Sequence, residues 1–422
     1  MKKFRIFLSV SLIILLAFGA FSFGAFAVID TYSDGESIDK SILLGNQTSA
    51  KTYTTELKSC ANMGNWQKYS ENSIEAITDC NTDYISVDVK LTNDGVPILM
   101  ADDTVDRMCI DAEGNTVTGA VSEKTYEEIS TYFLRYGNGG ELSKKSEYIV
   151  PSLKQALDAI DDENTLIIDV SMEDLGKVSG VVENEEKMNK VMFRLTDADS
   201  RDILSIIEKN EKFKNLIIPQ YNGNIIFGAN SLLKDTVDAK LNIVKVGTKN
   251  RNGVVLYDSY TKQFKEKSIM AMFSMVDEYS ADRSDDITGW DNVISHGYSI
   301  IETDYPELLE RYISSTEEMK KELTDLVRMC ESYLGGDFSA DSSKKFTAAY
   351  NTAKSYVSGV ASQSQLSGAF YDLSEAYSEL EQSSPDETAG KFTFSIGRII
   401  AVVLCGGGIV VSQVYLFKKR KK

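Results

Sequence analysis

The chain has 422 residues, a formal net charge of −18, five Cys and a single His. Its length allows one large domain with a smaller one, or two to three domains of modest size, and its 42% hydrophobic and 26% charged residues exclude disorder as the main state. The acidic balance argues against a nucleic-acid binder, which needs a basic face. The single His, His296, excludes every site that needs two histidines from one chain.

The amino terminus has the features of a secretory signal. Three basic residues precede an uncharged run over residues 6–29, and Ala25-Phe26-Ala27 supplies small residues near its end. The run contains 24 residues, which is also long enough to span a bilayer. We therefore expect residues 1–27 to be a cleaved signal peptide, with a retained N-terminal anchor as the alternative.

The carboxyl terminus is typical of a membrane anchor. Residues 399–417 carry no charge, and the five basic residues 418–422 follow them directly. This pattern predicts a C-terminal transmembrane helix over 399–417 and a cytoplasmic tail over 418–422, preceded by a polar linker over 383–398. Basic residues near both ends place the intervening chain outside the cell under the positive-inside rule. We expect a protein of the bacterial cell membrane with an extracellular ectodomain.

The predicted ectodomain is strongly acidic. All 63 acidic residues lie between the terminal segments, whereas nine of the 45 basic residues lie near the ends, which leaves the ectodomain with 36 basic residues and a net charge of −27. Such a charge favours solubility and repels anionic polymers and lipid headgroups unless cations bridge them.

Short apolar segments alternate with amphipathic segments over residues 57–313. This alternation predicts an α/β fold of the TIM-type (β/α)8 barrel, with helices expected at 71–78, 152–160, 198–209 and 306–313. Since the strand candidates number nine for eight places, one of them must belong to an insertion. The strand candidates are 57–63, 84–91, 96–100, 165–171, 191–195, 215–218, 243–246, 268–273 and 299–303.

The pattern changes to helical spacing over residues 316–382. Three apolar sets, separated by Gly-containing breaks, predict a three-helix bundle after the barrel. The sets are Leu323, Leu326, Val327, Cys330 and Leu334; Phe346, Ala349, Tyr350, Ala353 and Val357; and Leu366, Ala369, Phe370, Leu373, Ala376, Tyr377 and Leu380.

The cysteines do not define a disulfide framework. They are widely spaced, without a CxxC motif, and Cys330 lies in an apolar helical set, where we expect a core residue. A Cys60–Cys80 disulfide is the alternative to buried free thiols, which we favour.

Residues 83–107 contain a dense motif. They read DYISVDVKLTNDGVPILMADDTVDR and follow the pattern E-x-D-x-x-x-T-x-D-G-x-x-V-x-x-H-D-x-T-x-x-R of the glycerophosphodiester phosphodiesterase family, which the segment resembles. Further segments appear in the family's order, namely 61–64 for A-H-R-G, 70–73 for P-E-N-T, 150–153 for I-P-T-L and 301–306 for I-x-T-D-x-P. The resemblance implies a barrel that cleaves a phosphodiester with two His as acid and base, beside a divalent cation held by carboxylates.

The departures from the family pattern fall on these chemical groups. Asn62 and Ala101 stand at the two His positions, Met63 at the accompanying Arg position and Ser86 at the first metal-ligand Glu position, while Asp88 remains. Asn can form hydrogen bonds but cannot titrate, and Ala can do neither. Each general acid or base contributes roughly 10²–10⁴-fold to a rate, so the losses predict little or no activity.

The family's later Glu aligns best with Asp169, and its Lys with Ser171. In a second alignment, residues 191–195 supply that strand and Arg194 takes the Glu position. Asp88 and Asp169 are therefore the candidate metal ligands, but two carboxylates hold a cation poorly. We expect no cofactor, with weakly held Ca²⁺ or Mg²⁺ as the alternative.

Further candidate ligand-binding residues are Asn62, Glu71, Ser86, Asp102 and Trp290. For Glu71 and Asp102 the alternative is a hydrogen-bonding role at a helix start and in a loop. For Trp290 and Tyr305 two positions are equally compatible with the sequence, namely the lining of the barrel mouth and the core. His296 precedes the last strand, at the barrel end opposite the usual active site, and we expect an ordinary surface or helix-end residue.

The helical segment has a resemblance of its own. Residues 338–342 read FSADS and precede a helix with Phe346, Ala349 and Ala353, which is similar to a FIVAR-type repeat of Gram-positive surface proteins. The resemblance implies a spacer, or a domain that binds a carbohydrate or protein.

The leading interpretation is a membrane-anchored extracellular pseudoenzyme of the phosphodiesterase type, with a binding or scaffolding role. The alternatives are an active phosphoric diester hydrolase with rearranged catalytic residues, and a cell-surface adhesion or glycan-binding protein. The expected partners are the membrane, through the C-terminal helix, and a cell-wall glycan, a phosphodiester ligand or a surface protein, but no nucleic acid.

Overall fold

The computed structural model describes residues 56–223, 226–248, 253–276, 284–380, 400–405 and 408–413. The barrel and the helices that follow it belong to one compact unit, Asn46–Ser384. The predicted signal 1–27, the linker 383–398 and the tail 418–422 lie outside the described residues.

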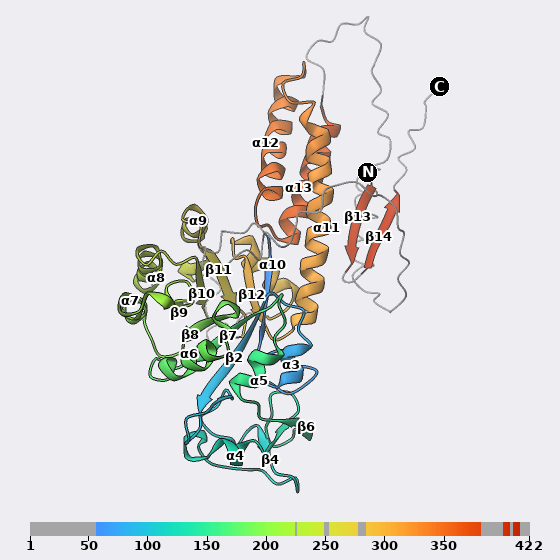
Figure 1. The fold of residues 1–422 in the computed structure, drawn as a ribbon. Helices are drawn as coiled ribbons and strands as arrows, with labels where there is room; N and C mark the ends of the chain where they lie inside the picture. Colours follow the sequence, from blue (N-terminus) through green and yellow to red (C-terminus); the bar gives the residue numbers. More distant parts are fainter. Residues whose placement is uncertain are drawn as a thin grey trace, which may run out of the picture. The chain divides into compact units, whose positions relative to one another are not determined.

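Eight parallel strands form a nearly closed barrel, which confirms the predicted TIM-type fold (Figure 1). At the seam between the first and last strands of the sheet, the Ile218 amide donates to the Phe193 carbonyl at 2.9 Å. In sheet order the strands are β8 (Val191–Leu195), β7 (Thr165–Val170), β2 (Tyr84–Leu91), β1 (Lys58–Asn62), β12 (Ile300–Thr303), β11 (Met270–Ser274), β10 (Ile243–Gly247) and β9 (Gln220–Asn222).

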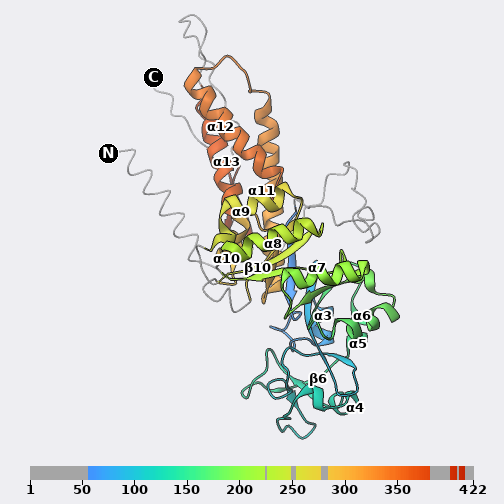
Figure 2. The same cartoon turned by 90° about the vertical axis from the view of Figure 1, so that its left-hand side faces the viewer.

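The helices of the α/β repeat cover the outside of the barrel (Figure 2). Side chains of Ser73, Ser152, Asp199 and Asp286 accept hydrogen bonds from first-turn amides, which explains where four of these helices begin. The helices are α3 (Ile74–Thr78), α5 (Leu153–Ala159), α6 (Leu175–Asn184), α7 (Ser200–Lys209), α8 (Ile226–Asp238), α9 (Asp258–Glu266) and α10 (Ile287–Ser295), with the short 3₁₀ turns η2 (Met188–Lys190), η3 (Glu211–Phe213) and η4 (Val254–Leu256).

One strand candidate, 96–100, is the insertion. It forms β3 (Pro97–Leu99), which pairs antiparallel with β2 after a turn at Gly95, whose φ is +76°. An antiparallel neighbour cannot take a place in the parallel barrel. The candidate at 215–218 is also corrected, because the barrel strand β9 begins two residues later, at Gln220.

The insertion continues into a small antiparallel sheet that the sequence did not predict. It has its own apolar cluster, which includes Met108, Ile129 and Leu134. Its elements are β4 (Cys109–Ile110), η1 (Val121–Glu123), α4 (Tyr126–Ile129), β5 (Phe133–Arg135) and β6 (Lys145–Ile149). Because the insertion follows β2, it lies at the carboxyl end of the barrel strands, which is the end where barrel active sites are built.

The inside of the barrel is apolar at the amino end of its strands. Inward residues such as Cys60, Tyr84, Ile167 and Met192 form one buried cluster there. Since alternate residues of a strand face the same side, the next inward positions lie two residues further on, toward the carboxyl end. Those positions are polar, and they define the candidate site.

Three long helices follow the barrel: α11 (Pro306–Glu331), α12 (Ala340–Val357) and α13 (Gln363–Ser378). Their buried faces meet in a cluster that contains Leu323, Phe346, Tyr350 and Leu373. Helix α11 is continuous, so the last barrel helix and the first bundle helix are one element. The expected boundary between residues 313 and 316 therefore falls inside a helix.

The apolar C-terminal segment differs from its prediction. Within 399–417 the structure describes an antiparallel strand pair, β13 (Ile400–Cys405) and β14 (Gly408–Gln413), where the sequence predicts a helix. Val and Ile at this density favour strands, and the Gly-rich centre of the segment disfavours a helix. Among the described residues, no helix is both long enough and apolar enough to cross a bilayer.

Four cysteines lie among the described residues outside the C-terminal strand pair. Cys60, Cys80, Cys109 and Cys330 are all buried free thiols. The prediction of free thiols is confirmed for these positions, and Cys330 lies in the core of the three helices.

Candidate functional site

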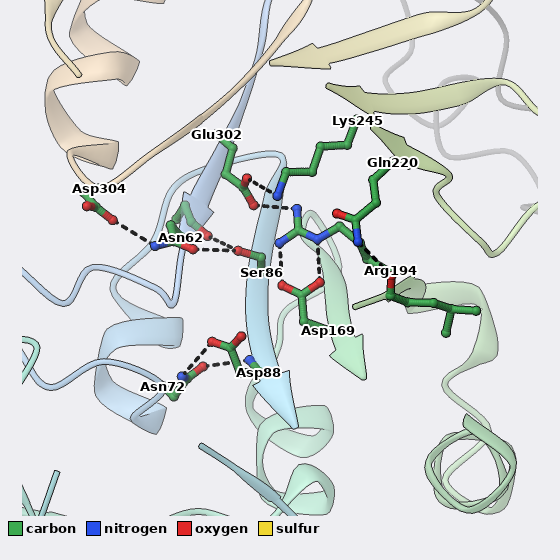
Figure 3. A network of polar contacts seen from close by, with 12 residues as sticks. Asn62, Asn72, Ser86, Asp88, Asp169, Arg194, Gln220, Lys245, Glu302 and Asp304 are labelled. Carbon is green, nitrogen blue, oxygen red and sulfur yellow. Dashed lines mark hydrogen bonds and ion pairs between the residues drawn. The ribbon is translucent and has the colours of Figure 1, made fainter. Parts of the chain in front are cut away.

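Five charged side chains occupy inward positions in the carboxyl half of the barrel. Asp88 lies on β2, Asp169 on β7, Arg194 on β8, Lys245 on β10 and Glu302 on β12 (Figure 3). Asp88 is in register with Asp169, and Asp169 with Arg194, so three neighbouring strands present charges at one level. The sheet thus places a polar layer directly above the apolar one.

Arg194 is the centre of this layer. Its guanidinium donates to both carboxylate oxygens of Asp169 and, at 2.6 Å, to Oε1 of Glu302. The Lys245 ammonium lies 3.2 Å from Oε2 of the same Glu302. β8 and β12 lie four places apart in the sheet order, so the Arg194 side chain reaches across the barrel.

These ion pairs are cut off from water. The side chains of Arg194 and Lys245 are each 4% exposed, and that of Glu302 is 0% exposed. Buried ions are tolerated when partners satisfy them, and removing one partner costs about 3–5 kcal/mol because the other is left uncompensated. The layer therefore closes the barrel interior with a fixed charge network.

Burial and charge move the pKa values of these carboxyls in opposite directions. Burial raises the pKa of Asp169 to about 6, against the attraction of Arg194, and burial likewise raises the pKa of Asp88. Burial alone would also raise the pKa of Glu302, but Arg194 and Lys245 hold it well below its usual range. Glu302 is thus the fixed anion of the network, while Asp169 and Asp88 are the carboxyls that protonate more readily.

The first family His position, Asn62, lies at the end of β1. Its Nδ2 donates to Oδ1 of Asp304 at 2.9 Å, and its Oδ1 lies 3.4 Å from the Ser86 hydroxyl. The Trp66 indole also donates to Oδ1 of Asp304, at 3.0 Å. Asn62 is therefore a hydrogen-bonding link between β1, β2 and the end of β12, and its amide cannot act as a general acid or base.

Asp88, the retained family aspartate, is held by Asn72. Nδ2 of Asn72 donates to Oδ2 of Asp88 at 3.2 Å, and the Asp88 amide donates to Oδ1 of Asn72 at 3.1 Å. Asn72 is buried and has a φ of +56°, a left-handed conformation that Asn tolerates better than most residues. The E-N part of the family motif thus supports the strand that carries Asp88.

Glu71 and Asp102 converge on one arginine. Arg107 donates to both oxygens of Glu71, at 2.5 and 2.8 Å, and through Nε to Asp102 at 2.6 Å. Glu71 is only 3% exposed, so its carboxylate is enclosed in this pairing. These contacts join the loop before α3 to the insertion, which supports the hydrogen-bonding alternative for both carboxylates.

The two aromatic candidates, Trp290 and Tyr305, differ in burial. Trp290 is 1% exposed and belongs to the apolar layer outside the strands, with its indole donating to Asp285 at 2.8 Å. Its burial favours the core-packing alternative, because α10 turns it toward the core. Tyr305 is 40% exposed just after β12, beside the end of the barrel that carries the polar layer.

Ala101 and His296 lie where the sequence placed them. Ala101, at the second family His position, follows β3 and is half-buried. His296 ends α10, and its Nδ1 lies 3.2 Å from Oδ1 of Asp258. Helices of the barrel end at the amino side of the strands, so His296 lies away from the polar layer, and its interpretation as a helix-end residue is confirmed.

The residues present do not fit the divalent cation that the family resemblance implies. Arg194 takes both oxygens of Asp169, and Ser86 supplies a hydroxyl where a carboxylate is expected. Within the described part of the chain, no group of three or more His, Cys, Asp or Glu side chains is arranged to hold a metal ion. Arg194 occupies both oxygens of Asp169 and Asn72 occupies one oxygen of Asp88, so the pair offers fewer oxygens than Ca²⁺ or Mg²⁺ requires.

Sequence reasoning missed the roles of Lys245, Glu302 and Asn72, and considered Arg194 only as an alternative Glu position. A signal was present, because each charged residue stands alone in a strand of apolar residues, as in IVKVG and VMFRL. A lone charge at an inward position of a buried strand needs a partner. Which strand supplies that partner depends on the closed barrel.

Comparisons with known proteins give one family match and several similar solved structures. Residues 63–253 match the model of the Glycerophosphoryl diester phosphodiesterase family. The chain is similar to a glycerophosphoryl diester phosphodiesterase structure from Parabacteroides distasonis, with 22% identity, 60% of this chain and 86% of that chain covered, and a TM-score of 0.47. No curated protein matches the chain.

Two further solved structures are also similar to this chain. A glycerophosphodiester phosphodiesterase from Agrobacterium tumefaciens is 19% identical, with 59% of this chain and 97% of that chain covered and a TM-score of 0.44. A phosphodiesterase from Oleispira antarctica, solved with the product sn-glycerol-3-phosphate, is 14% identical, with 60% and 95% covered and a TM-score of 0.44. From the family match over residues 63–253, the chain contains a domain of the glycerophosphoryl diester phosphodiesterase family.

Proposed function

We propose that this barrel is a non-catalytic member of its family and that it serves a binding or scaffolding role. The proposal rests on the residue that occupies the first family His position. Asn62 fills it, and its amide is bonded to Asp304 and Ser86 as part of the barrel framework. The second position, Ala101, offers no acid or base at all.

The charge network supports the same proposal. A phosphodiester needs positive charge to stabilise its transition state, whether from a metal or from unpaired cations. Here Arg194 and Lys245 are buried and directed at Glu302 and Asp169. The family's reaction would have to proceed without its acid, its base and its cation.

The proposed setting is the bacterial cell surface, with the domain outside the membrane. It is supported by the sequence of the two ends, namely the uncharged run after the basic N-terminus and the uncharged segment 399–417 before five basic residues. The acidic ectodomain fits a soluble surface domain. Candidate ligands are a cell-wall glycan, a phosphodiester compound or another surface protein.

A hydrolysis assay tests the proposal. The full chain is incubated with a glycerophosphodiester, glycerophosphocholine, in the presence of CaCl₂ or MgCl₂, and release of glycerol 3-phosphate is measured. We expect no release above the enzyme-free blank, because the loss of even one general acid or base lowers a rate by roughly 10²–10⁴-fold.

The Asp88→Ala variant is the control for this assay. Asp88 is the retained family aspartate, so genuine turnover at this site should depend on it. Turnover that is present in the wild type and lost in Asp88→Ala would overturn the proposal and favour an active hydrolase with rearranged residues. Equal traces of turnover in both proteins would indicate a contaminant.

A further inference from the structure

We propose that the guanidinium group of Arg194 is a built-in replacement for the divalent cation of this family. The resemblance implies cation ligands at the positions of Ser86, Asp88 and Asp169. In this chain the Asp169 oxygens both accept from Arg194, which also donates to Glu302. A covalently attached cation thus holds Asp169, a carboxylate at an implied ligand position, and joins it to Glu302 across the barrel.

The charges of the layer explain why a cation is needed there. Three inward carboxylates, on Asp88, Asp169 and Glu302, share the interior with two cations, on Arg194 and Lys245. Without Arg194, Lys245 would be the single cation left in this layer beside the three carboxylates. Carboxylates buried together repel each other strongly, because the surrounding dielectric is low.

The geometry explains why the replacement is an arginine. A guanidinium presents parallel N–H groups that match both oxygens of a carboxylate and still leaves donors for a second one. Arg194 uses this fork on Asp169 and its remaining Nη1 on Glu302, at 2.6 Å. The Lys245 ammonium lies 3.2 Å from Oε2 of Glu302, but it lacks the planar fork that pairs with both oxygens of a carboxylate.

The role of Arg194 can be measured through the stability of the fold, independently of turnover. If Arg194 takes the place of a metal, the wild-type fold does not bind a divalent cation in this layer. Divalent cations should then leave its thermal unfolding temperature unchanged. If Arg194 is removed, the oxygens of Asp169 and Glu302 are released, with Asp88 in register beside them. Calcium, which accepts irregular sets of oxygen ligands, should then be able to enter.

The experiment compares thermal unfolding of the full chain with and without about 10 mM CaCl₂ or MgCl₂, for the wild type and for Arg194→Ala. We expect the variant to unfold at a lower temperature than the wild type and to recover by about 2 °C or more in CaCl₂, as for a ligand present at about ten times its dissociation constant. The wild type should shift by less than about 0.5 °C.

Two control variants make the result specific. Lys245→Met also removes a buried cation from Glu302 but leaves Asp169 paired with Arg194, so it should be destabilised without responding to calcium. In Arg194→Ala/Asp169→Asn the predicted ligand is neutralised, and the calcium response should disappear. Arg194→Gln, which preserves more of the side-chain volume, is tested in parallel with Arg194→Ala.

The outcomes decide the proposal. A calcium response in Arg194→Ala or Arg194→Gln that is absent from the wild type and from both controls supports it, as does a variant that folds only when calcium is present. Stabilisation of the wild type by calcium would overturn it. The proposal is also overturned if both Arg194 variants are insensitive to calcium or fail to fold with it. None of these outcomes depends on whether the wild type hydrolyses a phosphodiester.

Discussion

At the scale of single residues, the barrel keeps the family's positions but changes what they do. Asn62 and Ser86 hold strands together, and Asp169 has become one half of a buried ion pair. The retained motif residues Glu71 and Arg107 pair with each other. A position that matches a family motif can therefore serve the fold, even where a neighbouring motif position has lost its titratable side chain.

The protonation of Asp169 gives a prediction at this scale. Burial raises its pKa to about 6, whereas an unfolded Asp has a pKa of about 4. The folded state then binds the proton more tightly, so Asp169 favours folding below about pH 4, and this contribution is lost as the pH rises to about 6. The free energy of unfolding of the wild type should fall by roughly 1–3 kcal/mol relative to Asp169→Asn over this range.

Urea unfolding at a series of pH values measures this difference, and Glu302→Gln is the matched control. Arg194 and Lys245 hold the pKa of Glu302 below its usual range, so the sign is reversed. The wild type should gain stability relative to Glu302→Gln as the pH rises through the acid range to about 4.5, and change little above it. The opposite result would be a gain in stability of the wild type relative to Asp169→Asn between about pH 4 and 6. That result would mean that the attraction of Arg194, rather than burial, sets the direction of the Asp169 pKa shift.

At the scale of elements, helix α11 connects two cores. Leu309 and Tyr312 near its start pack in the layer outside the barrel strands, and Leu323 and Val327 near its end pack among the three long helices. It spans 26 residues without a glycine, and its one proline is at the first position, where a helix tolerates it. The two cores therefore share a continuous hydrogen-bonded element.

A proline at Ser314 tests this connection. Ser314 is exposed, in the middle of α11, so Ser314→Pro breaks the helix at a cost of about 3 kcal/mol or more without disturbing a buried side chain. Both tryptophans, Trp66 and Trp290, precede α11, and Trp290 contacts Tyr312 in the part of α11 that packs on the barrel, before residue 314. Their fluorescence therefore reports the barrel, whereas far-UV circular dichroism also reports the long helices. The two signals should coincide during unfolding of the wild type and separate in Ser314→Pro.

Ser314→Ala is the control, because alanine keeps the helix and its unfolding should resemble that of the wild type. Coincident transitions in Ser314→Pro, at an unchanged midpoint, would mean that α11 does not couple the cores. Separate transitions in the wild type would also contradict the prediction, because the two cores would then unfold independently even with α11 intact.

At the scale of the whole molecule, the sequence predicted the parts better than their connections. Short apolar runs and helical apolar sets indicated the barrel and the helices, because local patterns reflect burial. A short apolar run suits both parallel and antiparallel strands, so the antiparallel pairing of β3 was not foreseen. Arg194 and Glu302 are 108 residues apart, and their contact follows only from closure of the barrel.

The connection between barrel and bundle is of this long-range kind. Gln365 at the start of α13 donates to the carbonyl of Ser295 at the end of α10, at 3.1 Å. Because barrel helices end at the amino side of the strands, the bundle contacts the barrel away from the polar layer, and both views show it on the side opposite the inserted sheet (Figures 1 and 2). The bundle therefore leaves the carboxyl end of the barrel uncovered.

Asp291 on α10 joins the two parts most directly, which gives the last prediction. Its carboxylate accepts from the Tyr312 hydroxyl on α11 at 3.0 Å, and from the Ser364 amide and hydroxyl on α13 at 3.1 and 2.6 Å. Hydrogen bonds to a charged group contribute about 1.5–3 kcal/mol each, so Asp291→Ala should free the first turn of α13. Hydrogen exchange of residues 362–366, followed by mass spectrometry, should accelerate by about tenfold or more.

The Asp325→Ala variant is the comparison for this experiment. Asp325 pairs with Arg328 on the same exposed face of α11, and such surface pairs contribute at most about 1 kcal/mol, so exchange in 362–366 should not change. If Asp291→Ala also left that exchange unchanged, the carboxylate would not hold the bundle, and the continuous helix α11 would be the main connection. If exchange rose throughout the barrel as well, Asp291 would stabilise the barrel itself, and the bundle would be part of its fold.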